Sequence, residues 1–209
     1  MSRSPFDRLL VAADNALRTL SGSAGSARAA PGSEAGSPAS PAERRHSAGL
    51  MRVNHAGEIC AQALYAGQSV VARDPEVRVA LERASAEERD HLEWCRGRLD
   101  ELDARPSLLD PLWYAGSFAL GVVSGLAGDR WSLGFLVETE RQVEQHLDGH
   151  LGMLPGSDAR SRAIIEQMRA DEIGHGRSGE ALGARELPPA VKAAMKVAST
   201  AMTRTAYWV

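Results

Sequence analysis

A pattern of glutamate and histidine occurs twice in this chain, once in each half. Each copy has a lone glutamate, and about thirty residues later the tetrapeptide Glu-x-x-His. The first copy contains Glu58, Glu88 and His91; the second contains Glu140, Glu172 and His175. Residues three apart on an α-helix share one face and are separated by about 4.5 Å along the axis, so both side chains can bind one ion. The repeat therefore predicts four helices whose acidic residues meet in the interior.

The rest of the sequence indicates an all-α fold. Alternating β-branched runs are scarce, and prolines punctuate the chain at Asp74-Pro75, Arg105-Pro106, Pro155-Gly156 and Leu187-Pro188-Pro189. We expect a four-helix bundle with an apolar crossover segment and a C-terminal helix. The expected ranges are 47–72, 75–104, 131–154, 158–183 and 189–205 for the helices and 111–128 for the apolar segment.

The N-terminal part of the chain differs in character from the rest. Apolar residues at three- and four-residue steps predict a short amphipathic helix within residues 1–20, beginning at Pro5. In residues 21–42, 20 of 22 residues are Ala, Ser, Gly or Pro, which predicts a flexible linker. Residues 43–209 then form the helical domain.

Composition excludes two classes of protein. With 24 basic and 27 acidic residues, the formal net charge is -3 and no dense basic run is present, so nucleic acid is not expected as a ligand. The two cysteines, Cys60 and Cys95, form no Cys-x-x-Cys pair, and the N-terminus has no signal-peptide pattern. We expect two reduced thiols rather than a disulfide-stabilised secreted domain.

The repeated pattern also makes an electrostatic prediction. Four buried, ionised glutamates are costly without positive charge beside them, and two divalent cations would balance them. Carboxylates with imidazoles suit iron or manganese, whereas zinc more often recruits cysteine. The same ligand set is described for ferritin-like di-iron and di-manganese bundles. The alternative is that these residues form solvated acidic helix faces with hydrogen-bonded histidines.

Longer motifs surround the pattern and resemble a known family. Arg52-Val53-Asn54-His55-Ala56-Gly57-Glu58 and Leu64-Tyr65-Ala66-Gly67-Gln68 resemble segments of the demethoxyubiquinone hydroxylases of ubiquinone biosynthesis, which are ferritin-like di-iron carboxylate proteins. Further matches are Glu88-Arg89-Asp90-His91-Leu92, Glu140-Arg141-Gln142-Val143-Glu144 with His146, and Asp171-Glu172-Ile173-Gly174-His175. The resemblance covers residues 48–209.

The resemblance implies an activity and a set of ligands. The reaction is hydroxylation of the ring of a demethoxyubiquinol-type polyprenyl quinone by O2, with the remaining electrons supplied by the quinol or NADH. Two iron ions per subunit would be held by the six residues of the repeat, with Glu88 and Glu172 bridging both. Other ubiquinone-biosynthesis proteins would be partners.

Three further residues are candidates for contacts around the ligands. His146 matches the family and is expected to orient a glutamate ligand. Asp171 precedes a ligand and is placed either to accept a hydrogen bond from a liganding imidazole or to face solvent. Tyr65 lies one helical heptad beyond Glu58, which places it either at the metal cavity or in the core.

A long isoprenoid substrate requires contact with a membrane, and two segments qualify. Residues 112–128 are uncharged and flanked by Trp113-Tyr114 and Trp131, as in lipid-interface segments. A full membrane crossing there would separate Glu88 and Glu140, so we expect an interfacial or re-entrant segment, a crossover connection, or a buried core helix. The helix at 188–209 is basic and ends in Tyr207-Trp208, which suits either anionic lipid or a cap on the bundle. We expect peripheral attachment to the cytoplasmic side of the cell membrane.

Two other functions fit parts of the sequence. A ferritin-like or rubrerythrin-like protein would use the same ligands to store iron or scavenge peroxide. Rubrerythrins normally add a Cys-x-x-Cys domain, which this sequence lacks, and ferritins lack the apolar insert. A quinone-binding scaffold without catalysis would leave the retention of all six ligands unexplained.

Overall fold

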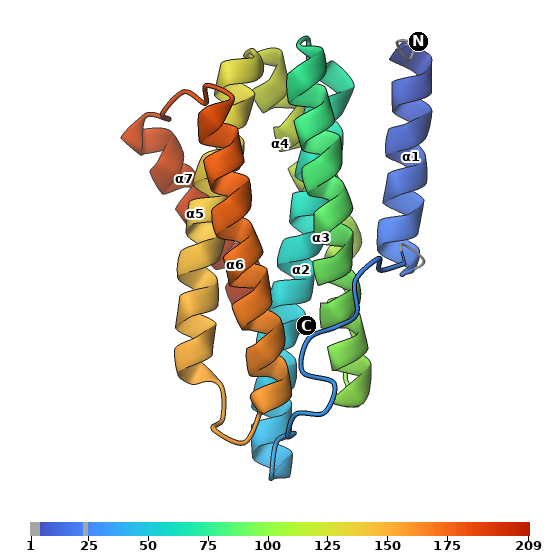
Figure 1. Cartoon of the computed structure of the whole chain (residues 1–209), viewed down its shortest axis with the longest axis vertical. Helices are drawn as coiled ribbons and strands as arrows, with labels where there is room; N and C mark the ends of the chain where they lie inside the picture. The colour runs from blue at the N-terminus through green and yellow to red at the C-terminus, as the bar shows by residue number, and fades with distance from the viewer. Residues whose placement is uncertain (1–4, 23–24) are drawn as a thin grey trace.

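The protein is built from α-helices arranged around a central bundle. The computed structural model describes residues 5–22 and 25–209, and within these it contains helices and no strand. The predicted all-α fold is therefore confirmed. The long helices α2, α3, α5 and α6 form the bundle, and α1 and α7 lie at its sides (Figure 1). The helices are α1 (Pro5–Ser21), α2 (Pro41–Val71), α3 (Pro75–Glu101), α4 (Asp110–Leu126), α5 (Asp129–Met153), α6 (Ala159–Ala181) and α7 (Pro189–Ala206).

Local capping residues determine where the bundle helices begin. The Ser40 hydroxyl accepts a hydrogen bond from the backbone N–H of Glu43, whose side chain accepts one from the Ser40 N–H in return. At the starts of α3 and α6, a carboxylate oxygen of Asp74 accepts a hydrogen bond from the Glu76 N–H, and one of Asp158 accepts from the Ser161 N–H. The loops at 72–74 and 154–158 are short, so α2 pairs with α3 and α5 pairs with α6 as antiparallel neighbours.

The apolar segment forms α4, which connects the two helix pairs and packs along α2. Their backbones approach closely because glycines lie at the contact. A Cβ atom at Gly121 would overlap the carbonyl oxygen of Leu64, and one at Gly67 would overlap that of Phe118. The expected crossover connection is therefore confirmed. Among the described helices, none combines the length and apolarity needed to cross a membrane.

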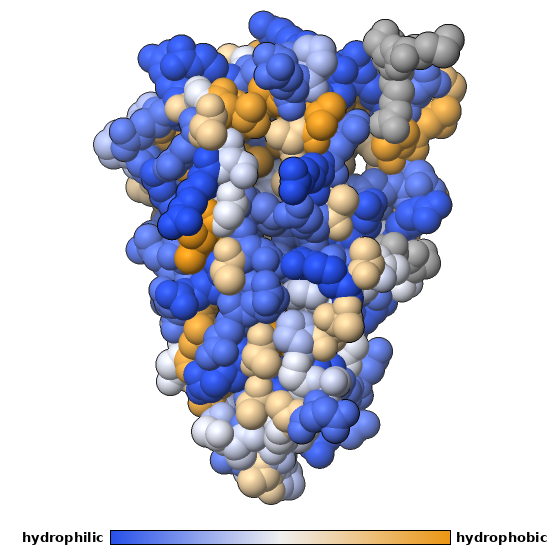
Figure 2. Space-filling model, in the orientation of Figure 1, coloured by the Kyte–Doolittle hydropathy of each residue, from blue (hydrophilic) through white to orange (hydrophobic). Residues whose placement is uncertain are grey.

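Helix α1 directs its apolar side away from the protein. Phe6 and Leu17 are 67% and 72% exposed, and Leu9 and Leu10 are also exposed, whereas Ala12 and Thr19 are buried. Figure 2 shows hydrophobic side chains gathered over α1 at the edge of a largely hydrophilic face. Residues 25–40 then cross α3 on the way to α2 (Figure 1). Residues 1–4 and 23–24, part of the expected helix and linker, lie outside the described residues.

Candidate metal centre

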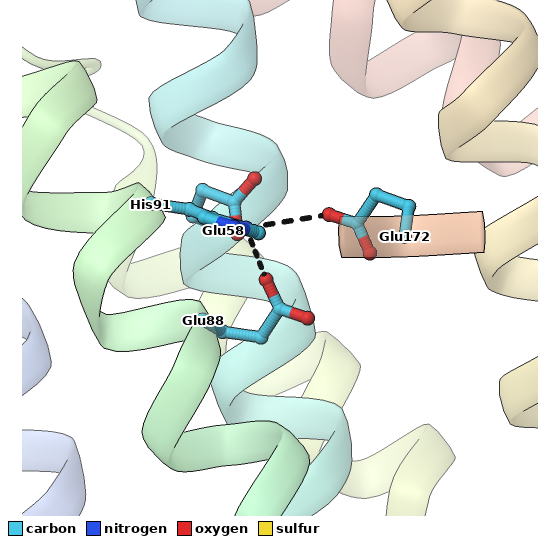
Figure 3. A group of neighbouring side chains, drawn as sticks. All are labelled: Glu58, Glu88, His91 and Glu172. Carbon is cyan, nitrogen blue, oxygen red and sulfur yellow. Dashed lines mark hydrogen bonds and ion pairs between the residues drawn. The ribbon is translucent and has the colours of Figure 1, made fainter. Parts of the chain in front are cut away.

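Four helices bring the six residues of the sequence repeat together in the interior. All six side chains are buried, the most exposed being His175 at 8%. Their ligand atoms form two groups, and within each group they lie within 4.8 Å of one another. The first group, drawn in Figure 3, contains Glu58, Glu88, His91 and Glu172; the second contains Glu88, Glu140, Glu172 and His175.

Glu88 and Glu172 belong to both groups. Glu88 Oε2 lies 2.8 Å from His91 Nδ1, and Glu88 Oε1 lies 2.8 Å from His175 Nδ1. Glu172 Oε1 lies 3.5 Å from His91 Nδ1, and Glu172 Oε2 lies 3.3 Å from His175 Nδ1. Each carboxylate thus offers one oxygen to each half of the centre, which is the arrangement that a carboxylate bridging two ions requires.

Two acidic residues outside the repeat hold the imidazoles. His91 Nε2 lies 2.9 Å from Asp171 Oδ2, and His175 Nε2 lies 2.7 Å from Glu87 Oε2. With Nε2 hydrogen-bonded in this way, Nδ1 of each ring faces the shared glutamates. Of the two positions expected for Asp171, beside a liganding imidazole or facing solvent, the structure shows the contact with the imidazole.

The role of Glu87 was missed from the sequence, although a signal was present. Each Glu-x-x-His is preceded directly by an acidic residue, Glu87 in the first and Asp171 in the second. Each of these residues contacts the histidine of the opposite tetrapeptide. The repeat thus extends by one residue and includes the hydrogen-bond acceptors of both rings.

Tyr65 contacts a residue of the centre, whereas the described ring contact of His146 is with His150. The Tyr65 hydroxyl donates a hydrogen bond to Glu140 Oε1, so the first of its two expected positions is observed. The ring of His146 packs edge-on against that of His150, with centroids 3.9 Å apart. Burial lowers the pKa of His146 to about 4. An orienting contact from His146 to a glutamate stays a prediction.

The pKa shifts within the centre reflect how closely its buried carboxylates approach one another. Burial, and then the neighbouring Glu88, raises the pKa of Glu58 well above its usual value. Burial and then Glu172 do the same for Glu140. Burial would lower the pKa of His175, but hydrogen bonds to Glu172 and Glu88 raise it to about 12. Ionised carboxylates are therefore costly at Glu58 and Glu140 unless positive charge lies beside them.

The residues present fit a pair of divalent cations. Glu58 Oε2 is buried and receives no hydrogen bond from any described residue, so it has an oxygen free for an ion. The donors are carboxylate oxygens and imidazole nitrogens, which suit iron or manganese. Neither Cys60 nor Cys95 belongs to either group.

One cavity adjoins the centre, and a second lies near it. One of about 700 Å³ lies between α3 and α6 and is lined by His175 and Glu87 together with apolar residues such as Leu136. The other, of about 610 Å³, lies beneath α1 and is lined by Tyr65 and Asp90. The centre is thus buried, and its His175 side borders a cavity.

Comparison with known proteins identifies relatives over nearly the whole chain. The family model of the ubiquinone biosynthesis protein COQ7 matches residues 45–206. Proteins named 3-demethoxyubiquinol 3-hydroxylase match from Polynucleobacter necessarius (54% identity over 206 residues, 98% of this chain and 99% of the relative) and Bordetella petrii (56% over 209 residues, 99% and 93%). A Bordetella avium protein of that name is 58% identical over 203 residues, 97% of this chain and 94% of its own length.

Proposed function

The chain belongs to the COQ7 family of ubiquinone biosynthesis proteins, and we propose that it is a 3-demethoxyubiquinol 3-hydroxylase. The reaction is hydroxylation of the ring of a polyprenyl quinol by O2. The observation that carries the proposal is the convergence of six buried ligand side chains in two groups that share Glu88 and Glu172. Relatives with this name match the chain almost end to end, which favours this reaction over iron storage or peroxide scavenging.

The six side chains of the repeat would hold two iron ions. Iron held there would supply two electrons to dioxygen, so that one oxygen atom enters the quinone ring and the other leaves as water. The quinol or NADH would return these two electrons to the iron. Asp171 and Glu87 orient the two imidazoles, and the Tyr65 hydroxyl fixes the Glu140 carboxylate. Burial of the ligands keeps bulk water from the reacting atoms.

Iron content tests the metal centre directly. Protein loaded with Fe(II) without oxygen and then desalted should retain about two iron ions per chain, as in other ferritin-like di-iron bundles. Glu172→Ala should lose iron and hydroxylation together, because Glu172 faces both histidines. Glu166→Ala, on the exposed side of the same helix, is the matched control and should retain both. Retained iron and turnover in Glu172→Ala would refute the ligand set.

Complementation tests the reaction. A strain blocked at this hydroxylation should recover its quinone when it expresses the chain, read out by lipid extraction and mass spectrometry. The strain expressing Glu172→Ala should continue to accumulate the demethoxy precursor. A wild-type chain that binds iron but fails to restore the quinone would refute the substrate and leave the metal centre intact.

The substrate's isoprenoid tail and three exposed surfaces support a peripheral position on the cytoplasmic side of the cell membrane. The apolar side of α1 faces outward. On α4, Leu112, Val123 and Leu126 are more than half exposed. Helix α7 presents Lys196 and Arg204 and is followed by Trp208, which is 81% exposed. Apolar and basic side chains of this kind suit an anionic lipid surface.

Vesicle flotation tests this position. The full chain should float with vesicles containing anionic lipid, and Leu17→Glu should reduce the floating fraction, because Leu17 is 72% exposed on α1. The control Asp14→Asn changes an exposed residue that already forms an ion pair with Arg18 and should float at least as well as wild type. If Leu17→Glu and wild type floated equally, α1 would not be part of the surface that binds lipid.

A further inference from the structure

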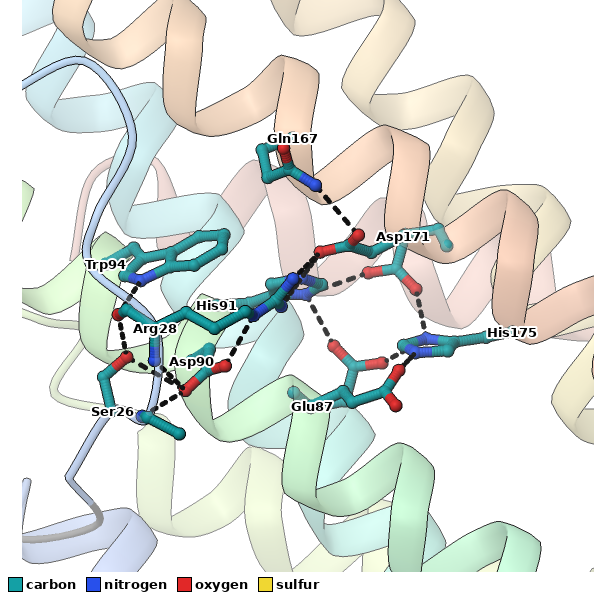
Figure 4. Close-up of polar contacts among 12 residues, drawn as sticks. Ser26, Arg28, Glu87, Asp90, His91, Trp94, Gln167, Asp171 and His175 are labelled. Carbon is teal, nitrogen blue, oxygen red and sulfur yellow. Dashed lines mark hydrogen bonds and ion pairs between the residues drawn. The ribbon is translucent and has the colours of Figure 1, made fainter.

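The low-complexity segment before α2 carries a single basic residue, and that residue reaches the metal centre. Within residues 21–42, Arg28 is the only lysine or arginine. Residues 25–31, here called the strap, lie across α3 (Figure 4). Composition alone gives such a segment little reason to order, so its order must come from contacts with α3 and α6, which lie beside it.

Two buried residues of α3 hold the strap. Asp90 Oδ1 accepts hydrogen bonds from the Ser26 hydroxyl at 2.9 Å and from the Ala27 backbone N–H at 2.7 Å. Asp90 Oδ2 lies 2.6 Å from Arg28 Nε. Trp94, one turn further on, donates its indole N–H to the Arg28 carbonyl oxygen at 3.2 Å. Its ring also lies 4.8 Å from the guanidinium carbon, which adds a cation–π contact.

The other edge of the same guanidinium faces a residue that holds a histidine ligand. Arg28 Nη1 lies 2.9 Å from Asp171 Oδ2, and this oxygen also lies 2.9 Å from His91 Nε2. Gln167, one turn before Asp171 on α6, donates to the second oxygen, Oδ1, at 2.9 Å. The planar guanidinium thus links Asp90 on α3 to Asp171 on α6.

We propose that Arg28 is a positioning residue of the metal centre, through which the strap fixes Asp171 against His91. This inference rests on the proposed metal-dependent function. The strap lies at the His91 side of the centre, where Arg28 links α3 to α6, and it follows α1 in the chain. The opposite histidine needs no such strap, because its partner Glu87 is bonded to Arg83 within α3 itself.

The metal readout compares Arg28→Gln with Arg169→Gln. Arg169 is 39% exposed against 40% for Arg28, and its ion pair is with Asp148. Loss of a residue that orients a metal ligand typically costs 10- to 100-fold in metal affinity. Arg28 acts on His91 mainly through Asp171, and Arg28 Nη2 also lies 3.4 Å from His91 Nε2. We therefore expect about a tenfold weaker affinity for Fe(II), titrated without oxygen. The absorption spectrum of the Co(II)-loaded variant should also change, since the His91 ring is less constrained, and Arg169→Gln should match wild type in both.

A second experiment measures how accessible the strap is to trypsin, which can cleave the strap only after Arg28. Asp90→Asn weakens the anchor of the strap but keeps Arg28, so trypsin should cleave after Arg28 faster than in wild type, with or without metal. Wild-type affinity and spectrum in Arg28→Gln would overturn the proposal while leaving the metal centre standing, and so would equal cleavage of Asp90→Asn and wild type. A wild-type chain that binds no Fe(II) would overturn the proposed function and this proposal together.

Discussion

Replacing Gly121 by alanine tests the contact that places the crossover helix α4 on α2. The new Cβ atom would overlap the carbonyl oxygen of Leu64 and lie 3.1 Å from the backbone nitrogen of Gln68. Both obstacles are backbone atoms of α2, so no side-chain rotation relieves the overlap, and the helices must separate. Overpacking of this kind costs about 1–3 kcal/mol, and the steric conflict with backbone favours the upper part of that range.

Part of this cost is offset, because alanine is the better helix former by about 1 kcal/mol. We expect Gly121→Ala to lower the free energy of unfolding by about 1–2 kcal/mol. Gly116 supplies the matched control on the same helix, since a Cβ atom there meets nothing within 4 Å. Gly116→Ala should keep the gain in helix propensity and raise stability by up to about 1 kcal/mol.

The free energy of unfolding of both variants can be measured by urea unfolding monitored by circular dichroism, with the dependence on urea concentration fitted separately for each variant. The two alanine variants should differ by about 2–3 kcal/mol, with wild type between them. If Gly121→Ala were as stable as Gly116→Ala, α4 would not approach α2 as closely as the structure shows. The reasoning about the crossover would then fail.

Further predictions concern a buried ion pair, a buried histidine and the metal. Arg98→Ala should cost about 3–5 kcal/mol in urea unfolding, because it leaves the fully buried Asp158 without its partner at 2.8 Å; a loss below about 1 kcal/mol would contradict this. Burial, and then His146, lowers the pKa of His150 to about 3. As pH falls below about 6.5, the unfolded chain therefore takes up a proton at this histidine before the folded chain does, and the free energy of unfolding declines between about pH 6.5 and pH 3. His150→Phe should flatten the decline by up to about 1.4 kcal/mol per pH unit, and an unchanged slope in urea titrations at pH 4.5–6.5 would refute the assignment. Chelation should lower the melting temperature of metal-loaded protein, since metal at 100 times its Kd contributes about 2.7 kcal/mol per site, whereas Glu172→Ala should not respond.

The helices and the candidate ligands could be predicted because their signals are local. The spacing of Glu88 and His91 places both on one helix face whatever the rest of the chain does. Proline and capping residues mark helix starts in the same local way, as at Asp74 and Pro75. Repetition of the pattern then indicated that the two halves share one site, and the structure brings all six residues together.

Contacts between helices could not be predicted in this way. His91 and Asp171 are 80 residues apart, and Glu87 and His175 are 88 apart, so their pairing depends on how α3 and α6 are rotated against each other. Composition likewise predicted only a linker around Arg28, because the partners that order it lie on α3 and α6.

The amino-acid sequence by itself determined which side chains share a helix face, since helical periodicity relates neighbours a few residues apart. It could not determine the direction in which a face points. Helix α1 is amphipathic by its sequence, yet only packing against α2 and α4 turned its apolar side outward and its polar side toward the bundle. Orientation is a property of the whole assembly of helices, because it depends on which surfaces meet and on how much apolar area they cover together.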